Sequence, residues 1–226
     1  MGYRSSRYRT PSSGGYTPGG TDVAIADGGT GQSTASAALA ALGGFDESTP
    51  TNYCETVPRH AVNGQITLTN NVLLVVYFTA QHSIASCGTV WSLSATASTT
   101  ATLARIGLYS VAGNGDLALI ASTANDTSMW QAAFDNPIRT FSAPTAITAG
   151  TRYALGYLVV GSTVAPALLG ALHSGGNANR WRTVLSLAPR AVGAVAGQTD
   201  LPASYAEASY AIASTVYSHP YSYLTT

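Results

Sequence analysis

The side chains that could do chemistry are few in this chain, and their spacing matches no catalytic motif. The four histidines are scattered, with no HExxH motif and no pair at zinc-ligand spacing; they are His60, His82, His173 and His219. No GxSxG motif, which would place a nucleophilic serine, is present. Every Lys or Arg position is arginine, so the chain has no lysine to form a Schiff base or to bind phosphate in a P-loop. We therefore expect a protein that is not an enzyme, with no catalytic residues, no metal and no cofactor.

The cysteines and acidic residues leave weaker possibilities open. Cys54 and Cys87 match no zinc spacing and are expected to be free, buried thiols. Glycoside hydrolysis needs paired carboxylates and calcium needs clustered oxygen ligands, but the acids in loop-like segments show neither pattern. We interpret them as turn residues, with hydrolase activity as an alternative; they are Asp46, Glu47, Asp116, Asp126 and Asp135.

Aromatic residues are the stronger indication of a binding surface. Five tyrosines crowd residues 205–226, and a tyrosine ring offers a flat apolar face with a polar rim, which suits sugars and protein interfaces alike. Trp91 lies inside a predicted strand and is expected in the core. The candidate adhesion residues are Tyr217, Tyr221, Tyr223, Trp181 and Trp130. Packing of the tyrosines against the sheet or a neighbouring subunit is equally open.

The composition indicates a folded chain that avoids charge. Of 226 residues, 46% are hydrophobic and only 9% are charged, which is too apolar for a disordered chain. The formal net charge is zero, so we expect no nucleic-acid partner. The longest apolar run, Val72–Phe78, is too short for a bilayer that needs about 20 residues, and we expect no membrane span and no signal peptide.

Residues 1–20 are predicted to form an extended anchoring arm. They hold three of the ten arginines and no acid, a charge of +3, which leaves −3 on residues 21–226. Their richness in Gly, Ser, Pro and Tyr cannot build a core, so we expect the arm to dock onto a partner. The predicted anchoring residues are Tyr3, Arg4, Arg7, Tyr8 and Arg9.

Residues 21–54 are predicted to bring identical chains together. A glycine-rich turn precedes a helix over Ala35–Leu42, which Gly43 can end. Eight residues fall below the roughly 12 needed for marginal helicity in isolation, so this helix must pack on another surface. An oligomeric partner supplies that surface economically; the predicted contact residues between chains are Gly28, Gly29, Thr30, Gly31, Leu39 and Leu42. A monomeric sandwich with an N-terminal helix is the alternative.

From residue 55 to residue 226 the pattern changes to short strands separated by turn residues. We expect an antiparallel β-sandwich, which in its eight-stranded form would be a jelly roll. The loop Ala112–Asp116 favours a hairpin between its flanking strands, and Arg152–Val160 is apolar on both faces and therefore central. The predicted strands are Gln65–Thr69, Val72–Ala80, Gly88–Ala95, Leu103–Val111, Leu117–Thr123, Arg152–Val160, Thr183–Leu187 and Tyr210–Val216.

The segment Asp27-Gly28-Gly29-Thr30-Gly31-Gln32-Ser33-Thr34, with the Ala-rich stretch and Leu-Gly that follow, resembles a repeat of tailed-bacteriophage fibre proteins. In that family the repeat lies in the shaft or near the attachment end of a trimeric fibre. The β-rich remainder is similar to phage globular domains at Ile106-Gly107-Leu108-Tyr109 and Ala149-Gly150-Thr151-Arg152-Tyr153. The repeat occurs once here, which favours a short spike over a long shaft.

The resemblance implies a structural protein of the virion surface, either a tail fibre or a head fibre. Its arm would bind other virion proteins, and its β-sandwich would adhere to host cell-surface glycan. Two alternatives remain at this stage: a capsid decoration or cementing protein without a ligand, and a carbohydrate-binding module of a virion-associated hydrolase.

Overall fold

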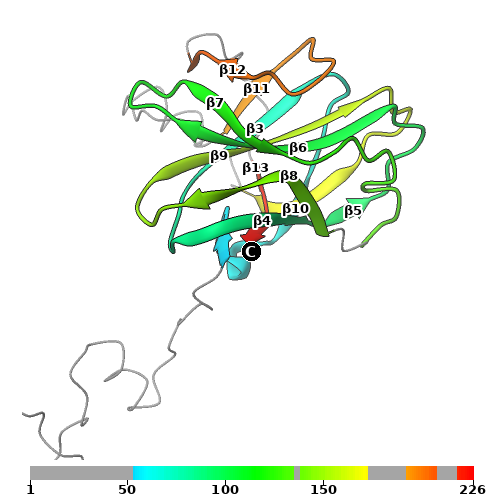
Figure 1. The fold of residues 1–226 in the computed structure, drawn as a ribbon. Coiled ribbons are helices and arrows are strands. Elements are labelled where there is room, and N and C mark those ends of the chain that lie inside the picture. The colour runs from blue at the N-terminus through cyan, green and yellow to red at the C-terminus, as the bar shows by residue number, and fades with distance from the viewer. Residues whose placement is uncertain (1–52, 135–137, 173–191, 208–217) are drawn as a thin grey trace, which may run out of the picture. The chain divides into compact units, whose positions relative to one another are not determined.

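The computed structural model describes residues 53–134, 138–172, 192–207 and 218–226 (Figure 1). Every strand pairing within these ranges is antiparallel. The described residues form an antiparallel β-sandwich, which confirms the predicted fold class. Residues 1–52 lie outside these ranges, as do the predicted strands Thr183–Leu187 and Tyr210–Val216. Residues 1–52 comprise the anchoring arm and all but the last two residues of segment 21–54, and those two residues belong to the first strand of the sandwich.

One layer of the sandwich is a six-stranded sheet, which occupies the upper part of Figure 1. Its strand order is β11 (Val192–Val195), β3 (Leu73–Thr79), β9 (Arg152–Val160), β6 (Leu103–Val111), β7 (Leu117–Ser122) and β12 (Ser204–Tyr205). The β6–β7 hairpin and the central place of β9 confirm two of the sequence predictions.

Two smaller sheets supply strands below it. The first, which we call the platform sheet, runs β1 (Tyr53–Glu55), β14 (Ser222–Thr225), β4 (Ile84–Ser92) and β8 (Ile138–Ile147). The second runs β13 (Ser218–Pro220), β10 (Ala167–Leu172) and β2 (Gly64–Thr67), with β5 (Ser94–Thr96) also paired to β10. A short 3-10 helix, η2 (Arg59–Ala61), lies between β1 and β2 in the chain.

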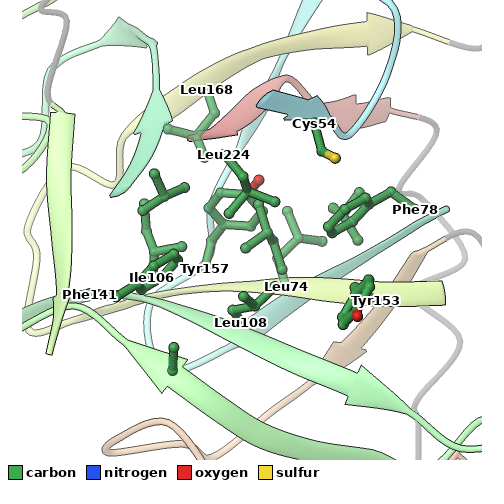
Figure 2. Packing of buried hydrophobic residues seen from close by; sticks show 14 of the residues in the cluster. Cys54, Leu74, Phe78, Ile106, Leu108, Phe141, Tyr153, Tyr157, Leu168 and Leu224 are labelled. Atoms are coloured by element: carbon green, nitrogen blue, oxygen red, sulfur yellow. The ribbon is translucent and has the colours of Figure 1, made fainter. Parts of the chain in front are cut away.

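The main core lies between the six-stranded sheet and the inner faces of the two smaller sheets (Figure 2). Leu74 and Phe78 of β3 and Tyr157 of β9 face it from one side, and Leu224 and Leu168 face it from the other. Alternate residues of the same strands point to the opposite face of the six-stranded sheet, where they form a second buried cluster. Burial on both faces explains why β3 and β9 are nearly continuous apolar runs.

In the second cluster the ring of Tyr109 covers two glycines. Gly107 of β6 and Gly156 of β9 are register partners, and a Cβ on either would lie 2.9 Å from Cε2 of Tyr109. The absence of both side chains therefore lets the Tyr109 ring lie against the bare backbone of two neighbouring strands. Leu201 completes the cover, with Cδ1 3.1 Å from the position of a Gly107 Cβ.

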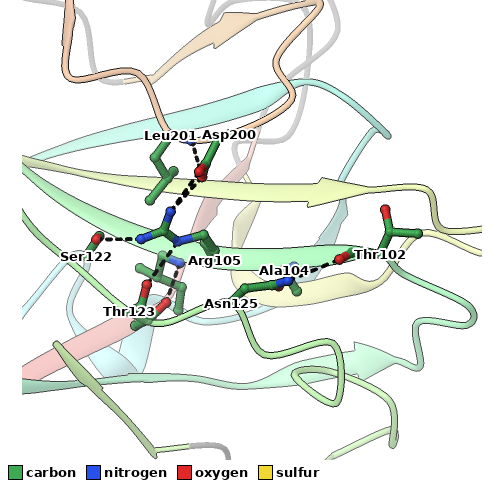
Figure 3. A network of polar contacts seen from close by, with 9 residues as sticks. Thr102, Ala104, Arg105, Ser122, Thr123, Asn125, Asp200 and Leu201 are labelled. Carbon is green, nitrogen blue, oxygen red and sulfur yellow. Dashed lines mark hydrogen bonds and ion pairs between the residues drawn. The ribbon is translucent and has the colours of Figure 1, made fainter. Parts of the chain in front are cut away.

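An arginine clamp holds the segment that carries Leu201 (Figure 3). The Arg105 guanidinium donates from NH1 to both carboxylate oxygens of Asp200 at 2.7 and 2.9 Å, and from NH2 to Ser122 Oγ at 2.8 Å. Asp200 Oδ1 also accepts the backbone N–H of Leu201 at 2.7 Å. A forked, charge-assisted contact thus fixes Leu201 over the glycine pair.

The structure departs from the predicted strands where the sequence pattern is weak. The predicted strand Gly88–Ala95 is divided into β4 and β5, which belong to different sheets. β8 was not predicted because it is an exposed edge strand that contains Pro144 and lacks strict alternation. β10 was not predicted because its sequence, ALLGAL, favours a helix as much as a strand.

We predict that Gly156→Ala destabilises the fold by about 1–3 kcal/mol, because the added methyl group overlaps the Tyr109 ring and Leu73. Urea denaturation measures this change. Gly113→Ala is the matched control: nothing lies within 4 Å of its Cβ position, so stability should change by about 0.5 kcal/mol or less. Equal stability of the two variants would contradict the close packing of Tyr109 on Gly156.

Candidate functional site

Most of the residues that the sequence nominates lie outside the part of the chain that the structure describes. This applies to the anchoring residues Tyr3, Arg4, Arg7, Tyr8 and Arg9, to the trimer residues Gly28, Gly29, Thr30, Gly31, Leu39 and Leu42, and to Tyr217 and Trp181. Tyr221, Tyr223 and Trp130 lie within the described residues, and the structure separates Trp130 from the two tyrosines.

Trp130 is a core residue, which corrects its assignment to an exposed contact surface. Its side chain is fully buried in the main cluster, together with that of Met129. The backbone N–H of Ser98 donates to the Trp130 carbonyl at 2.6 Å, which ties this loop to the chain before β6. Its ring is therefore hidden from any ligand.

Tyr221 and Tyr223 lie beside two aromatic residues that the sequence did not nominate. Tyr223 of β14 stacks on Trp91 of β4, with ring centroids 5.0 Å apart and an interplanar angle of 21°. Tyr53 of β1 meets Tyr223 edge-on at 6.3 Å, and Tyr221 meets Trp91 edge-on at 5.5 Å. We call Tyr53, Tyr223, Trp91 and Tyr221 the aromatic platform.

The register of the platform sheet places Tyr53, Tyr223 and Trp91 on its outer face, whereas Tyr221 lies just before β14 and is buried. Tyr223 is directly opposite Trp91, and their chain neighbours Leu224 and Val90 point into the core. Because side chains alternate between the two faces, Trp91 and Tyr223 point outward, and both are half-buried. This corrects the expectation that Trp91 is a core residue: a position inside a strand does not decide which face it occupies.

A second cross-strand row lies beside the platform and carries hydroxyl groups. Tyr53 pairs with Thr225, Thr225 with Thr89, and Thr89 with Thr140, one residue from each strand of the sheet. We call Thr225, Thr89 and Thr140 the threonine row. The Thr89 hydroxyl is buried, so the outer face offers aromatic rings and, in an adjacent row, the hydroxyl groups of Thr225 and Thr140.

A polar clamp fixes the β1 end of this face. The Glu55 carboxylate accepts Tyr221 OH at 3.0 Å and Arg59 Nε at 2.8 Å, both on Oε1. The Arg59 guanidinium carbon lies 5.3 Å from the centroid of the Tyr53 ring, and NH2 donates to Tyr53 OH. Burial and the neighbouring Glu55 raise the pKa of Tyr221 well above its usual range, so its phenol stays a donor at neutral pH.

The cysteines and acidic residues considered for other chemistry are buried or bonded within turns. Cys54 and Cys87 are free and buried, as the sequence predicted. Asp116 accepts from Asn114 within the β6–β7 turn, and Asp126 accepts from Ser128 N–H at 2.9 Å, as turn residues do. Among the described residues no group of three or more His, Cys, Asp or Glu side chains could hold a metal ion.

Comparison with known proteins adds no assignment. No family model matches the chain, and no curated protein matches it either. Within the described residues, no helix has both the length and the apolarity to cross a membrane.

We predict that both cysteines resist alkylation in the folded protein. Burial raises the pKa of the Cys54 thiol and raises that of Cys87 to about 12, so at pH 8 only about one Cys87 in ten thousand is a thiolate. Iodoacetamide labelling followed by mass spectrometry should show no adduct until urea unfolds the chain. Rapid labelling of the native protein would show that these thiols are accessible.

Proposed function

We propose that the protein is a structural component of a tailed-phage virion, a short homotrimeric spike that adheres to host cell-surface glycan. The observation that carries the adhesive part is the outer face of the platform sheet, where Tyr53, Tyr223 and Trp91 lie beside the threonine row. Tyrosine and tryptophan give rigid amphipathic contact area at a low entropic cost, and hydroxyl groups match the polar groups of a sugar.

The platform is held firmly, as a binding surface requires. Glu55 is largely buried and bonds to both Arg59 and Tyr221, and the Tyr221 backbone N–H donates to Leu169 of the neighbouring sheet at 2.8 Å. The rings are therefore positioned before a ligand arrives, so little ordering entropy is lost on binding.

Weak individual contacts suffice when several copies bind together. In a trimer, once one sandwich has bound the cell surface, the other two are held close to further glycans. Their binding is then effectively intramolecular and occurs at a high effective concentration. The resemblance of residues 27–43 to the phage fibre repeat supports this arrangement, with residues 1–20 bound to the particle.

A cementing role is the second candidate, and two exposed apolar side chains favour it. Phe134 is 70% exposed and Ile138, the register partner of Trp91, is 54% exposed. Because Ile138 is paired with Trp91, it lies on the same face of the sheet and extends the apolar surface of the platform, and an exposed apolar patch is typical of protein contacts. A cementing protein would bind the particle through this end of the platform sheet and would bind no glycan.

We predict that Trp91→Ala abolishes glycan adhesion. Removal of the ring deletes the stacking partner of Tyr223 and should weaken each contact by about tenfold or more, which three linked contacts amplify. The measurement is binding of the full-length protein to an array of bacterial surface polysaccharides. Val164→Ala, which shortens a side chain that is 47% exposed and lies outside the platform, is the matched control and should bind like the wild type. Absence of wild-type binding to every glycan would favour the cementing role.

We predict that a Leu39→Asp, Leu42→Asp variant of the full chain is monomeric. Two carboxylates on the predicted helix would be forced into an apolar contact between chains, which is strongly unfavourable. Light scattering measures the mass, and Ser36→Asp, which adds one carboxylate at a polar helix position, is the control. A wild-type protein that is monomeric at micromolar concentration would contradict the trimeric spike.

A further inference from the structure

Arg59 is the exposed fixed charge on the outer face of the platform sheet, within the described part of the chain. Its side chain is 64% exposed, whereas that of Glu55, its partner, is only 11% exposed. The other described acids lie elsewhere: Asp126 pairs with Arg139, Asp200 pairs with Arg105 on the six-stranded sheet, and Asp116 and Glu207 meet beside the β6–β7 turn. Of the described acidic side chains, the largely buried Glu55 is the one that bonds to Tyr221 and Arg59, so Arg59 is the exposed charged side chain at this end of the platform.

The Arg59 guanidinium is oriented by two residues, Glu55 and Tyr53, which hold its Nε and NH2 nitrogens. Nε and NH2 bond to Glu55 Oε1, NH2 also donates to Tyr53 OH, and the plane lies over the Tyr53 ring. NH1 has no partner among the described residues. Hydrogen bonding to Glu55 raises the pKa of Arg59 further, so the group stays a cation at every physiological pH.

The two rows of the outer face fix the direction of a bound chain. Register partners place Tyr53, Thr225, Thr89 and Thr140 in a line that crosses all four strands. At about 4.8 Å per strand this line extends roughly 14 Å, which is long enough for an oligosaccharide rather than a single sugar. Arg59 stands at its Tyr53 end, so the line runs from hydroxyl groups to a cation.

We propose that the platform binds an acidic oligosaccharide that lies across the strands, with a sugar carboxylate at Arg59. This inference rests on the proposed adhesive function and names its ligand class. The rings of Tyr53, Tyr223 and Trp91 contact the apolar parts of the sugar rings, the Thr225 and Thr140 hydroxyl groups bond to the sugar hydroxyl groups, and Arg59 NH1 donates to the carboxylate. A charge-assisted hydrogen bond from a pre-oriented guanidinium distinguishes acidic from neutral glycans.

The test uses the full-length protein and an array on which each acidic bacterial polysaccharide is printed twice, as isolated and after reduction of its carboxylates to primary alcohols. The wild type should bind at least one acidic glycan roughly tenfold or more better than its reduced form. Arg59→Gln should lose this preference, so that its binding to the acidic and reduced forms differs by less than about twofold.

A double variant controls for the second role of Arg59, which neutralises Glu55. Glu55→Gln, Arg59→Gln removes both charges and leaves no unpaired carboxylate, so it should also lose the preference for the acidic form. Arg59→Lys, which keeps the charge without the fork, should keep part of it. Thermal melting of each variant verifies its fold.

The outcomes separate this inference from the adhesive function on which it rests. Equal wild-type binding to acidic and reduced forms, with loss of both in Trp91→Ala, would overturn the acidic class alone. Retention of the preference in the folded double variant would overturn the assignment to Arg59. Absence of binding to every printed glycan would overturn both proposals.

Discussion

The insertion of β14 between β1 and β4 is the constraint on which the outer face of the platform sheet depends. Cys54 pairs with Leu224, and Leu224 pairs with Val90, so the inward-facing residues of three strands fix the register. Because the side-chain period of a strand is two, a slip of one residue would turn Tyr223 inward and expose Leu224. Core packing on one side of the sheet thus determines the order of aromatic and hydroxyl groups on the other.

The second buried cluster gives that face a rigid support. Tyr109 lies over Gly107 and Gly156, and Arg105 holds Asp200 so that Leu201 closes the cover. The six-stranded sheet is consequently packed on both faces, and its inner face presents the ordered layer of side chains against which Leu224 and Cys54 pack. The chain has few charged residues, and the ion pairs Arg105–Asp200 and Arg59–Glu55 each hold a segment of the chain in place.

The sequence predicted the elements whose signal is local. β6, β7 and β9 are found almost as predicted, because a Gly-Asn-Gly-Asp turn and a strand apolar on both faces are visible within ten residues. The platform was only partly predictable: Tyr221 and Tyr223 stood out by their clustering, whereas Tyr53 and Trp91 join them through pairings across more than 130 residues. Trp130 and Trp91 were assigned to the wrong environments for the same reason, since burial depends on which sheet covers a residue.

The position of β14 also bears on how the protein is made. A ribosome adds β1 and β4 on the order of 130 residues or more before β14, and each of these strands then presents an edge whose partner has not yet been synthesised. Such long-range pairing is slow, and uncovered edges invite pairing with other nascent chains. The three-residue length of β1 limits how far a foreign strand can extend along that strand, and the proline in β8 has the same effect at the opposite edge of the sheet.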